Sequence, residues 1–260
     1  KNLFLMESRM KPALPAVEAS CAFFVCHLIK IHYIDSFFMY LIFTHNLLIE
    51  IYWWHMHIEI LGGKNEIGGN KIIVEHKGTR IFLDFGMSFG QSAKFFSEFL
   101  QPRKCAALSD FFELGLLPDI KGIYRQDYLK HMERPQENRS LDAVLLSHAH
   151  ADHAQYVHFL RHDIPIYCTQ ATKIILQALE ETGSNTCSDL VTGCEAFKFY
   201  INKKGEKSRV TSKQAEYVFS REYKLMQPSN KVQIVCLEVE MVPVDHSLPG
   251  ACGFIIYSDE

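Results

Sequence analysis

A dense run of potential metal ligands directly behind an apolar stretch is the strongest constraint on this chain. Residues 141–147 are apolar from Ala143 to Leu146, a pattern typical of a short strand that is buried on both faces. The sequence His-Ala-His-Ala-Asp-His follows at once as residues 148–153. Any fold of this chain must therefore place these imidazoles and this carboxylate at the end of a core strand.

The spacing within this cluster predicts which side chains share a metal ion. Side chains two positions apart in an extended loop point the same way, so His148 and His150 can bind one ion. Asp152 and His153 begin the next helix, where adjacent side chains diverge, so they can serve a second ion. Imidazole nitrogen suits zinc, manganese and iron, and a carboxylate adds a harder oxygen ligand. An isolated histidine is usually an ordinary hydrogen-bonded residue, but a cluster of this density predicts a metal site.

The composition excludes several classes of protein. The chain has 260 residues, of which 48% are hydrophobic and 22% charged, so it can bury a core and is not disordered. Its net charge of −3 gives no global basic field, so a nucleic-acid partner would need a local patch. The eight cysteines include no Cys-x-x-Cys pair, which argues against a disulfide framework or a cysteine-rich zinc site. We expect reduced, mostly buried thiols and a cytoplasmic location.

The first 55 residues differ from the rest of the chain. Residues 36–54 are about long enough to cross a bilayer, but Glu50 interrupts them, and a charge at bilayer depth is costly. A spanning helix is therefore disfavoured, and no stable membrane association is expected. We expect residues 1–55 to be an apolar extension outside the native working protein, with a weak membrane segment as the alternative. A coherent strand pattern begins after Met56, which would be the natural start.

From Met56 onward, strand patterns and helix patterns alternate. We expect strands at residues 57–61, 71–76, 79–85, 141–147, 164–168, 232–237, 241–244 and 251–257. The dipeptide Lys77-Gly78 between the second and third of these predicts a hairpin turn. Because most of these strands are apolar on both faces and helices lie between them, residues 56–260 predict an α/β layered fold.

Three helices are expected in the same region. The first is short, begins at a Ser92 cap and has an apolar side made of Phe95, Phe96, Phe99 and Leu100. The second follows the histidine cluster and carries two residues that we expect to be ordinary surface or half-buried histidines, His158 and His162. The third spans residues 171–181, stops at Gly183 and has an apolar face made of Ile174, Ile175, Ala178 and Leu179. Residues 101–140 contain three prolines and are expected to be irregular.

Several segments together resemble one enzyme superfamily. Residues 148–153, directly after an apolar strand, resemble the second motif of the metallo-β-lactamase superfamily, for which this pattern is highly specific. Residues 81–86, Ile-Phe-Leu-Asp-Phe-Gly, resemble its first motif, an aspartate at the end of an early strand. Residues 245–250, Asp-His-Ser-Leu-Pro-Gly, resemble the third motif as it occurs in β-CASP nucleases and ribonuclease J. The opening at residues 61–70 is similar to that of the ribonuclease J group, and the resemblance covers residues 56–260.

The resemblance implies the αββα sandwich of that superfamily, of which this chain would form the first half only. His148, His150 and His246 would hold one metal ion. Asp152 and His153 would hold the other. The implied cofactors are therefore two divalent metal ions, with zinc expected and manganese as the alternative.

Two of the implied site residues also have ordinary explanations. Asp84 would orient a ligand histidine, but a turn carboxylate at a strand end fits the sequence too. His246 stands alone in the sequence, and its loop between two strands is what favours a ligand role. We take Asp152 and Asp84 as the candidate catalytic carboxylates.

The family pattern also has two later motifs. One is an aspartate that bridges both ions, usually within a Gly-Asp pair, and the other is a histidine much further along. Neither occurs before Glu260, and the β-CASP insertion that would follow that aspartate is absent as well. We therefore expect a fragment of a longer protein, with a weak second metal position and little turnover of its own.

Two further segments have a functional and a plain explanation each. The Gly-rich residues 61–70 lack the Gly-Lys-Ser/Thr of a P-loop. They are either a tight turn or a place where the backbone approaches a phosphate or the rim of the site. The basic stretch from Lys198 to Lys213 could contact phosphates, although a solvated loop is the simpler interpretation.

The chemistry implied by this site is metal-dependent hydrolysis. Two divalent ions about 3.5–4 Å apart can convert a water molecule to a hydroxide that attacks phosphorus or a carbonyl carbon. The leading hypothesis is cleavage of RNA phosphodiester bonds, with RNA as the expected partner and DNA as the alternative. A small-molecule hydrolase acting on a thioester or lactam is the rival enzyme, and a non-catalytic nucleic-acid-binding subunit is the rival without catalysis. A homo-oligomer is compatible with the sequence.

Overall fold

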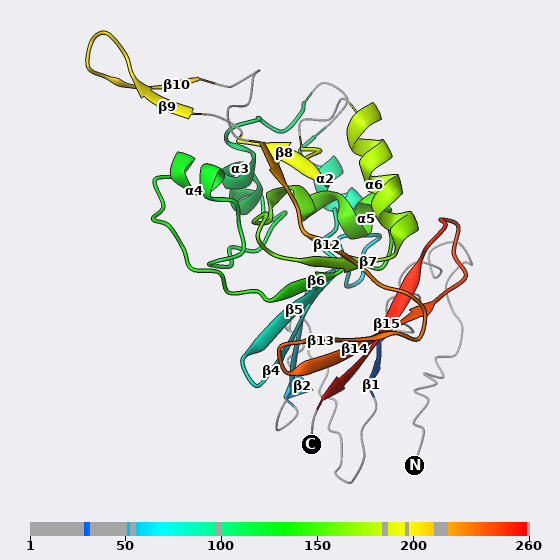
Figure 1. Ribbon diagram of the computed structural model, residues 1–260. Coiled ribbons are helices and arrows are strands. Elements are labelled where there is room, and N and C mark those ends of the chain that lie inside the picture. The colour runs from blue at the N-terminus through cyan, green and yellow to red at the C-terminus, as the bar shows by residue number, and fades with distance from the viewer. Residues whose placement is uncertain are drawn as a thin grey trace.

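The structure is a computed structural model that places the helices and strands in layers (Figure 1). It describes residues 29–31, 51–52, 56–96, 100–183, 187–195, 198–210 and 218–258. In these residues helices cover one face of a large sheet, and a smaller sheet packs against the other face. The predicted α/β layered fold is therefore confirmed, and helix, sheet and sheet are three of the four layers of the expected sandwich.

The larger sheet of the described residues has seven strands. In spatial order they are β12 (Tyr223–Leu225), β7 (Ile166–Cys168), β6 (Ala143–Leu145), β5 (Thr79–Leu83), β4 (Lys71–His76), β3 (Met56–Gly62) and β2 (Ile51–Tyr52). Strands β2 to β5 pair antiparallel, whereas β5, β6, β7 and β12 are parallel neighbours. Lys77 and Gly78 turn between β4 and β5 with φ of 46° and 80°, which confirms the predicted hairpin.

The smaller sheet carries the last strands of the chain. Its order is β1 (Ile29–Ile31), β15 (Cys252–Ser258), β14 (Leu237–Pro243) and β13 (Lys231–Ile234). The predicted strand at residues 232–237 is wrong at its end, because the chain turns at Val235, which has a φ of 51°. Leu237 therefore already belongs to β14, which pairs with β13 in antiparallel register.

Two short antiparallel pairs complete the described strands. One joins β8 (Thr192–Cys194) to β11 (Val218–Ser220). The other joins β9 (Lys198–Ile201) to β10 (Lys207–Val210) as a hairpin. The basic stretch from Lys198 to Lys213, for which a solvated loop is the simpler interpretation of the sequence, is therefore partly built of strands.

The core lies on both faces of the larger sheet, because successive strand residues point to opposite sides. Val144 and Leu145 are both fully buried, and the first faces the helices while the second faces the smaller sheet. The helical side contains a group of packed aromatic rings, among them Phe82, Phe111 and Phe159. This two-sided burial confirms the strand pattern predicted ahead of the histidine cluster.

The helices differ from the predictions in two places. They are α2 (Phe89–Ala93), α3 (Ala107–Glu113), α4 (Gln126–His131), α5 (Ala151–Ala154), the 3₁₀ helix η1 (Gln155–Phe159) and α6 (Gln170–Thr182). The Ser92 cap is wrong, because Ser88 Oγ accepts from the Gln91 N–H and starts α2 four residues earlier. Helices α3 and α4 lie in the stretch predicted as irregular, since its prolines fall between the helices rather than inside them.

Helix α6 confirms the predicted helix, and Ile175 of its predicted apolar face packs against the core, but the rest of that face is not buried as expected. Thr172 and Leu176 are buried, whereas Ile174 and Leu179 are 55% and 48% exposed. The buried side of the helix includes Thr172, because its hydroxyl donates to the Gly250 carbonyl oxygen at 3.3 Å. A polar residue with a buried partner can thus occupy the core side of a helix.

Residues 1–55 are described only at two strands. Strand β2 pairs with β3 in the larger sheet, and β1 runs parallel to β15 in the smaller one. The rest of that stretch and Phe99 of the predicted first helix lie outside the described residues, so the extension stays a prediction. Across the described ranges, helices are too short or too polar to traverse a bilayer.

We predict that two leucines of α6 differ sharply in their effect on stability. Replacing Leu176, which is 1% exposed, with Ala should lower the free energy of unfolding by about 2–5 kcal/mol, because it leaves a cavity. The matched change at the exposed Leu179 should alter it by no more than about 0.5 kcal/mol. Urea denaturation followed by circular dichroism measures both, and equal losses would contradict the assigned helix face.

Candidate metal centre

The site forms where two neighbouring parallel strands end. Strands β5 and β6 run in the same direction, so Asp84 after β5 and Ser147 after β6 emerge at the same edge of the sheet. The backbone N–H of Asp84 donates to the Leu145 carbonyl at 2.9 Å and continues the pairing to that edge. Asp84 has a φ of 58°, an uncommon conformation that turns its carboxylate into the loop following β6.

Asp84 is saturated by hydrogen-bond donors from that loop. Its Oδ1 accepts from the Ser147 backbone N–H at 2.7 Å, and its Oδ2 accepts from the Ser147 hydroxyl at 2.8 Å. Its Oδ2 also lies 2.6 Å from Nδ1 of His153. A buried carboxylate is stable only when donors replace its water, and here the same donors fix the histidine loop. These contacts tie Asp84 to His153 and to the loop that carries the histidine cluster.

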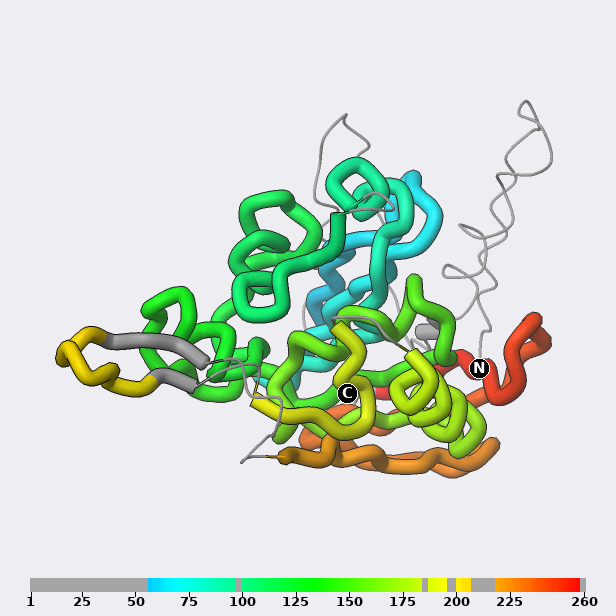
Figure 2. The backbone as a smooth tube through the Cα atoms, turned by 90° about the horizontal axis from the view of Figure 1, so that it is seen from above, coloured from blue at the N-terminus to red at the C-terminus, as the bar shows by residue number. Residues whose placement is uncertain are grey.

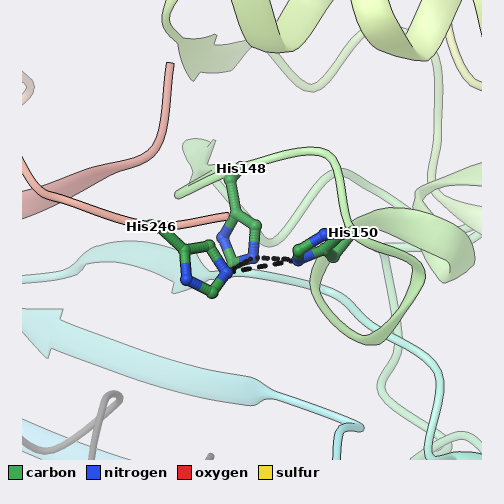
Figure 3. A group of neighbouring side chains, drawn as sticks. All are labelled: His148, His150 and His246. Atoms are coloured by element: carbon green, nitrogen blue, oxygen red, sulfur yellow. Dashed lines mark hydrogen bonds between the residues drawn. The ribbon is translucent and has the colours of Figure 1, made fainter. Parts of the chain in front are cut away.

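Three imidazole nitrogens converge from two distant segments (Figure 3). Nε2 of His148 lies 3.0 Å from Nδ1 of His150 and 3.1 Å from Nε2 of His246. The third separation, between His150 Nδ1 and His246 Nε2, is 3.2 Å. In a tetrahedral zinc site with Zn–N bonds of about 2.0–2.1 Å, the ligand nitrogens are separated by about 3.3–3.4 Å. The donor set therefore fits one metal ion in both element type and spacing.

The protonation of these rings suits a ligand role. Burial, followed by the neighbouring charge of His153, lowers the pKa of His148 to about 3, so its ring is neutral at pH 7. The Ser147 hydroxyl donates its proton to Asp84, so its oxygen accepts a hydrogen bond from Nδ1–H of His148. With the proton on Nδ1, the Nε2 atom of His148 carries a lone pair. Burial and the nearby His150 lower the pKa of His246 as well.

Asp152 and His153 form a second set beside the first. His153 Nδ1 faces Asp84, so its Nε2 points the other way, 3.4 Å from Asp152 Oδ2 and 3.1 Å from the Asn70 side-chain nitrogen. Burial lowers the pKa of His153, but the carboxylate of Asp84 outweighs it and gives a net rise. The rings of His148 and His153 have centroids only 4.0 Å apart, so the two sets adjoin.

His246 reaches the site because its loop is tied down at both ends. The loop joins β14 to β15 and is closed by the Val244 N–H, which donates to the Ala251 carbonyl at 3.2 Å. The Thr169 hydroxyl at the start of α6 donates to the Gly250 carbonyl at 2.8 Å. Gly250 has a φ of 82°, and a Cβ there would lie 2.6 Å from Thr169 Oγ1, so only glycine fits without strain.

The Gly-rich segment forms the turn between β3 and β4 and also lies against the site, so both of its proposed explanations apply in part. A Cβ on Gly68 would lie 2.5 Å from Asp152 Cβ, and one on Gly86 would lie 1.7 Å from the Asp152 carbonyl oxygen. The backbone N–H of Asn70 also donates to that oxygen at 3.1 Å. The glycines are therefore needed for close approach of two backbones.

Sequence reasoning missed three residues that support the site. Ser147 links the aspartate to the histidines, and Asn70 contacts His153. Lys71 is 3% exposed, and its ammonium donates to the carbonyls of Gly69 and Gly86 at 2.9 and 2.8 Å. Burial lowers its pKa to about 8. The available signal was a lysine at the start of an otherwise apolar strand, since a buried lysine needs carbonyl or carboxylate partners.

The two histidines after the cluster lie outside the metal centre. His158 was expected at the surface or half-buried, which is wrong, because it is 1% exposed. Its Nε2 lies 2.8 Å from the Tyr128 hydroxyl, and its Nδ1 accepts from the Asp189 N–H at 3.0 Å. His162 is half-buried as expected and stacks on Phe219. Both rings are therefore used by local packing.

The thiols follow the predicted pattern where they are described. Cys105, Cys168, Cys187 and Cys252 are buried, and Cys194 and Cys236 are partly buried. All six are free thiols. The other two cysteines lie outside the described residues.

Comparison with known proteins identifies relatives for more than half of the chain. Residues 117–260 match a family model described as the beta-lactamase superfamily domain. The chain is 31% identical to ribonuclease J of Pyrococcus abyssi over 118 residues, which cover 44% of this chain and 23% of that protein. It is 43% identical to transcription termination factor FttA of Methanothermobacter thermautotrophicus over 123 residues, which cover 46% of this chain and 15% of that protein.

One solved structure resembles most of the described fold. A protein of unknown function from Enterococcus faecalis V583 matches with a TM-score of 0.54 and 25% sequence identity. The match covers 78% of this chain and 41% of that protein. The chain therefore spans less than half the length of each of these relatives.

We predict that the carboxylate of Asp84 strengthens metal binding without being a ligand. Asp84→Asn keeps the shape but removes the charge and one acceptor, so zinc affinity should fall by about 10–100-fold. The matched variant Asp142→Asn alters a carboxylate that accepts from the Arg80 N–H at the other end of β6, and its zinc affinity should be unchanged. Competition with a chromophoric chelator measures both, and equal affinities for Asp84→Asn and the unaltered chain would contradict the role.

Proposed function

The chain belongs to the beta-lactamase superfamily, and from this we propose that it carries the metal-binding part of a nuclease that hydrolyses RNA phosphodiester bonds. The predicted metallo-β-lactamase fold is confirmed by this family and by the layered sheets. The observation that carries the proposal is the convergence of three imidazole nitrogens beside a second His–Asp pair. Such a paired ligand set is typical of hydrolases that use two metal ions.

The proposed ligands divide into the two sets seen in the structure. His148 Nε2, His150 Nδ1 and His246 Nε2 would hold one divalent ion. Asp152 and His153 Nε2 would hold the other. Ions held there would stabilise the negative charge of the reacting group and make water a better nucleophile at neutral pH. Zinc is the proposed metal and manganese the alternative, because both accept imidazole and carboxylate ligands.

Other residues of the chain would fix the protonation state and the position of the ligand histidines. Asp84 and Ser147 together keep protons on Nδ1 of His148 and His153, which leaves both Nε2 atoms as electron-pair donors. Asp152 differs from Asp84, because its carboxylate accepts no hydrogen bond from the residues that the structure describes, and its Oδ2 lies 3.4 Å from Nε2 of His153. Asp152 is therefore the proposed catalytic carboxylate, and Asp84 is a positioning residue.

RNA is the proposed substrate because of the names of the relatives. The two curated proteins described above are a ribonuclease and a transcription termination factor, and they match 118 and 123 residues of this chain. The third-motif loop 245–250 and the Gly-rich segment 61–70, which resemble the RNA-processing branch, both contact the site. A small-molecule ester or amide substrate remains the alternative outcome of the test below.

We predict that the complete gene product degrades single-stranded RNA and that His148→Ala abolishes this activity. Loss of a ligand should lower the rate by about 100-fold or more, the scale at which one lost electrostatic group slows a reaction. His162→Ala is the matched control, since that ring stacks on Phe219 away from the metal ligands, and it should retain activity. Gel analysis of a labelled RNA measures the rates. Intact RNA together with cleavage of a thioester would show that the substrate assignment is wrong.

A further inference from the structure

One hairpin of the molecule projects from its body. Strands β9 and β10 pair only with each other among the described strands, with Lys207 opposite Ile201 and Val210 opposite Lys198. In Figures 1 and 2 the hairpin extends beyond one edge of the helical layer, whereas the β14–β15 loop lies on the other side. An isolated two-stranded ribbon is marginally stable in water, so a projecting hairpin needs local support or a partner.

The tip of this hairpin is a turn closed by hydrogen bonds of Asn202. Asn202 Oδ1 accepts from the backbone N–H groups of Lys204 and Glu206, both at 2.9 Å. The Asn202 side-chain amide also donates to the Glu206 carboxylate at 2.9 Å. Gly205 has a φ of 77° and lets the chain reverse at this point. The turn therefore fixes the backbone of Lys203 and Lys204 and keeps the carboxylate engaged with Asn202.

The charge of the hairpin is opposite to that of the whole chain. Its cationic residues are Lys198, Lys203, Lys204, Lys207 and Arg209. Glu206 is its acidic residue, in a chain whose net charge is −3. Lys203 and Lys204 are exposed, and no ion pair or side-chain hydrogen bond links their ammonium groups to the described residues. This local basic surface is the patch that a polyanion would need on an otherwise acidic protein.

Exposed apolar groups accompany these charges. Tyr200 is 50% exposed and Ile201 is 66% exposed, on the strand that leads into the tip. Proteins that bind single-stranded nucleic acid combine cations along the backbone with aromatic rings on which bases stack. A protein partner with an acidic surface would use the cations but would not need an exposed tyrosine next to them.

We propose that residues 200–206 form an RNA-binding arm that holds single-stranded substrate by its phosphates and one base. The proposal rests on the proposed function for the identity of the polymer, and it adds a second contact region outside the metal centre. Because the hairpin lies on the other side of the helical layer from the β14–β15 loop, which carries His246, it contributes to affinity for long RNA and not to the hydrolysis step itself. Short RNA that fills only the metal centre gains nothing from the arm.

Binding measurements on the 260-residue chain test this proposal without requiring hydrolysis. Fluorescence anisotropy with a labelled single-stranded RNA of about 30 nucleotides, in chelator, gives the dissociation constant at several salt concentrations. For Lys203→Gln/Lys204→Gln we expect about tenfold weaker binding, and a slope of log affinity against log salt that is smaller by about 1.4. Tyr200→Ala should weaken binding about tenfold with the slope unchanged.

The control variant also removes two positive charges, but at a place remote from the hairpin. Lys77 precedes β5, and the Lys121 carbonyl accepts from the Ser140 hydroxyl just before β6, so both lie at the end of the larger sheet remote from the histidines. Lys77→Gln/Lys121→Gln should leave RNA affinity and salt slope unchanged. Equal affinities for the hairpin variant and the unaltered chain would overturn the arm, as would an equal loss in this control. Failure of RNA hydrolysis with an intact hairpin effect would instead count against the proposed function alone.

Discussion

Three imidazole nitrogens that face one another at 3.0–3.2 Å are the constraint on which the rest of the site depends. A proton can lie along one side of such a triangle, but the remaining lone pairs still point at each other. A cation bound by all three removes this repulsion, which is why clustered histidines so often bind metals. The surrounding hydrogen bonds hold a proton on Nδ1 of His148 and of His153. The lone pair of each ring therefore lies on its Nε2 atom.

The fold brings this triangle together from segments almost a hundred residues apart. Parallel strands β5 and β6 set Asp84 beside the histidine loop, and the smaller sheet supplies His246 through the loop after β14. The Cys252 N–H donates to the Ser147 carbonyl at 3.0 Å and joins the second sheet to the loop of the first. The two-sheet packing is therefore part of the site, since it fixes where His246 lies relative to His148.

The sequence predicted the structure well where a few adjacent residues specify both the local conformation and the side-chain chemistry. The run from His148 to His153 behind a doubly buried strand, the Lys77-Gly78 turn and the final strand were all predictable, because each is specified by a few adjacent residues. Resemblance to a known motif was needed for His246, since no local rule joins it to His148. The roles of these residues as metal ligands stay a prediction, while their convergence is a property of the structure.

Other features could not be predicted because they depend on contacts remote in sequence. The buried face of α6 follows from the hydrogen bond between Thr172 and Gly250, and the burial of His158 follows from its partners Tyr128 and Asp189. Lys71 stands at the start of β4, and its ammonium joins the Gly-rich segment to the loop after Asp84. In each case a polar group is buried because it forms a hydrogen bond with a specific partner. A hydrophobic pattern does not reveal that partner.

The most direct test of this account is a crystal structure of the zinc-loaded chain with anomalous data at the zinc edge. The account predicts a zinc ion bonded to Nε2 of His148, Nδ1 of His150 and Nε2 of His246, each at about 2.0–2.1 Å. Zinc bound only to cysteine thiolates, or at a position that leaves these three imidazoles pointing apart, would contradict it.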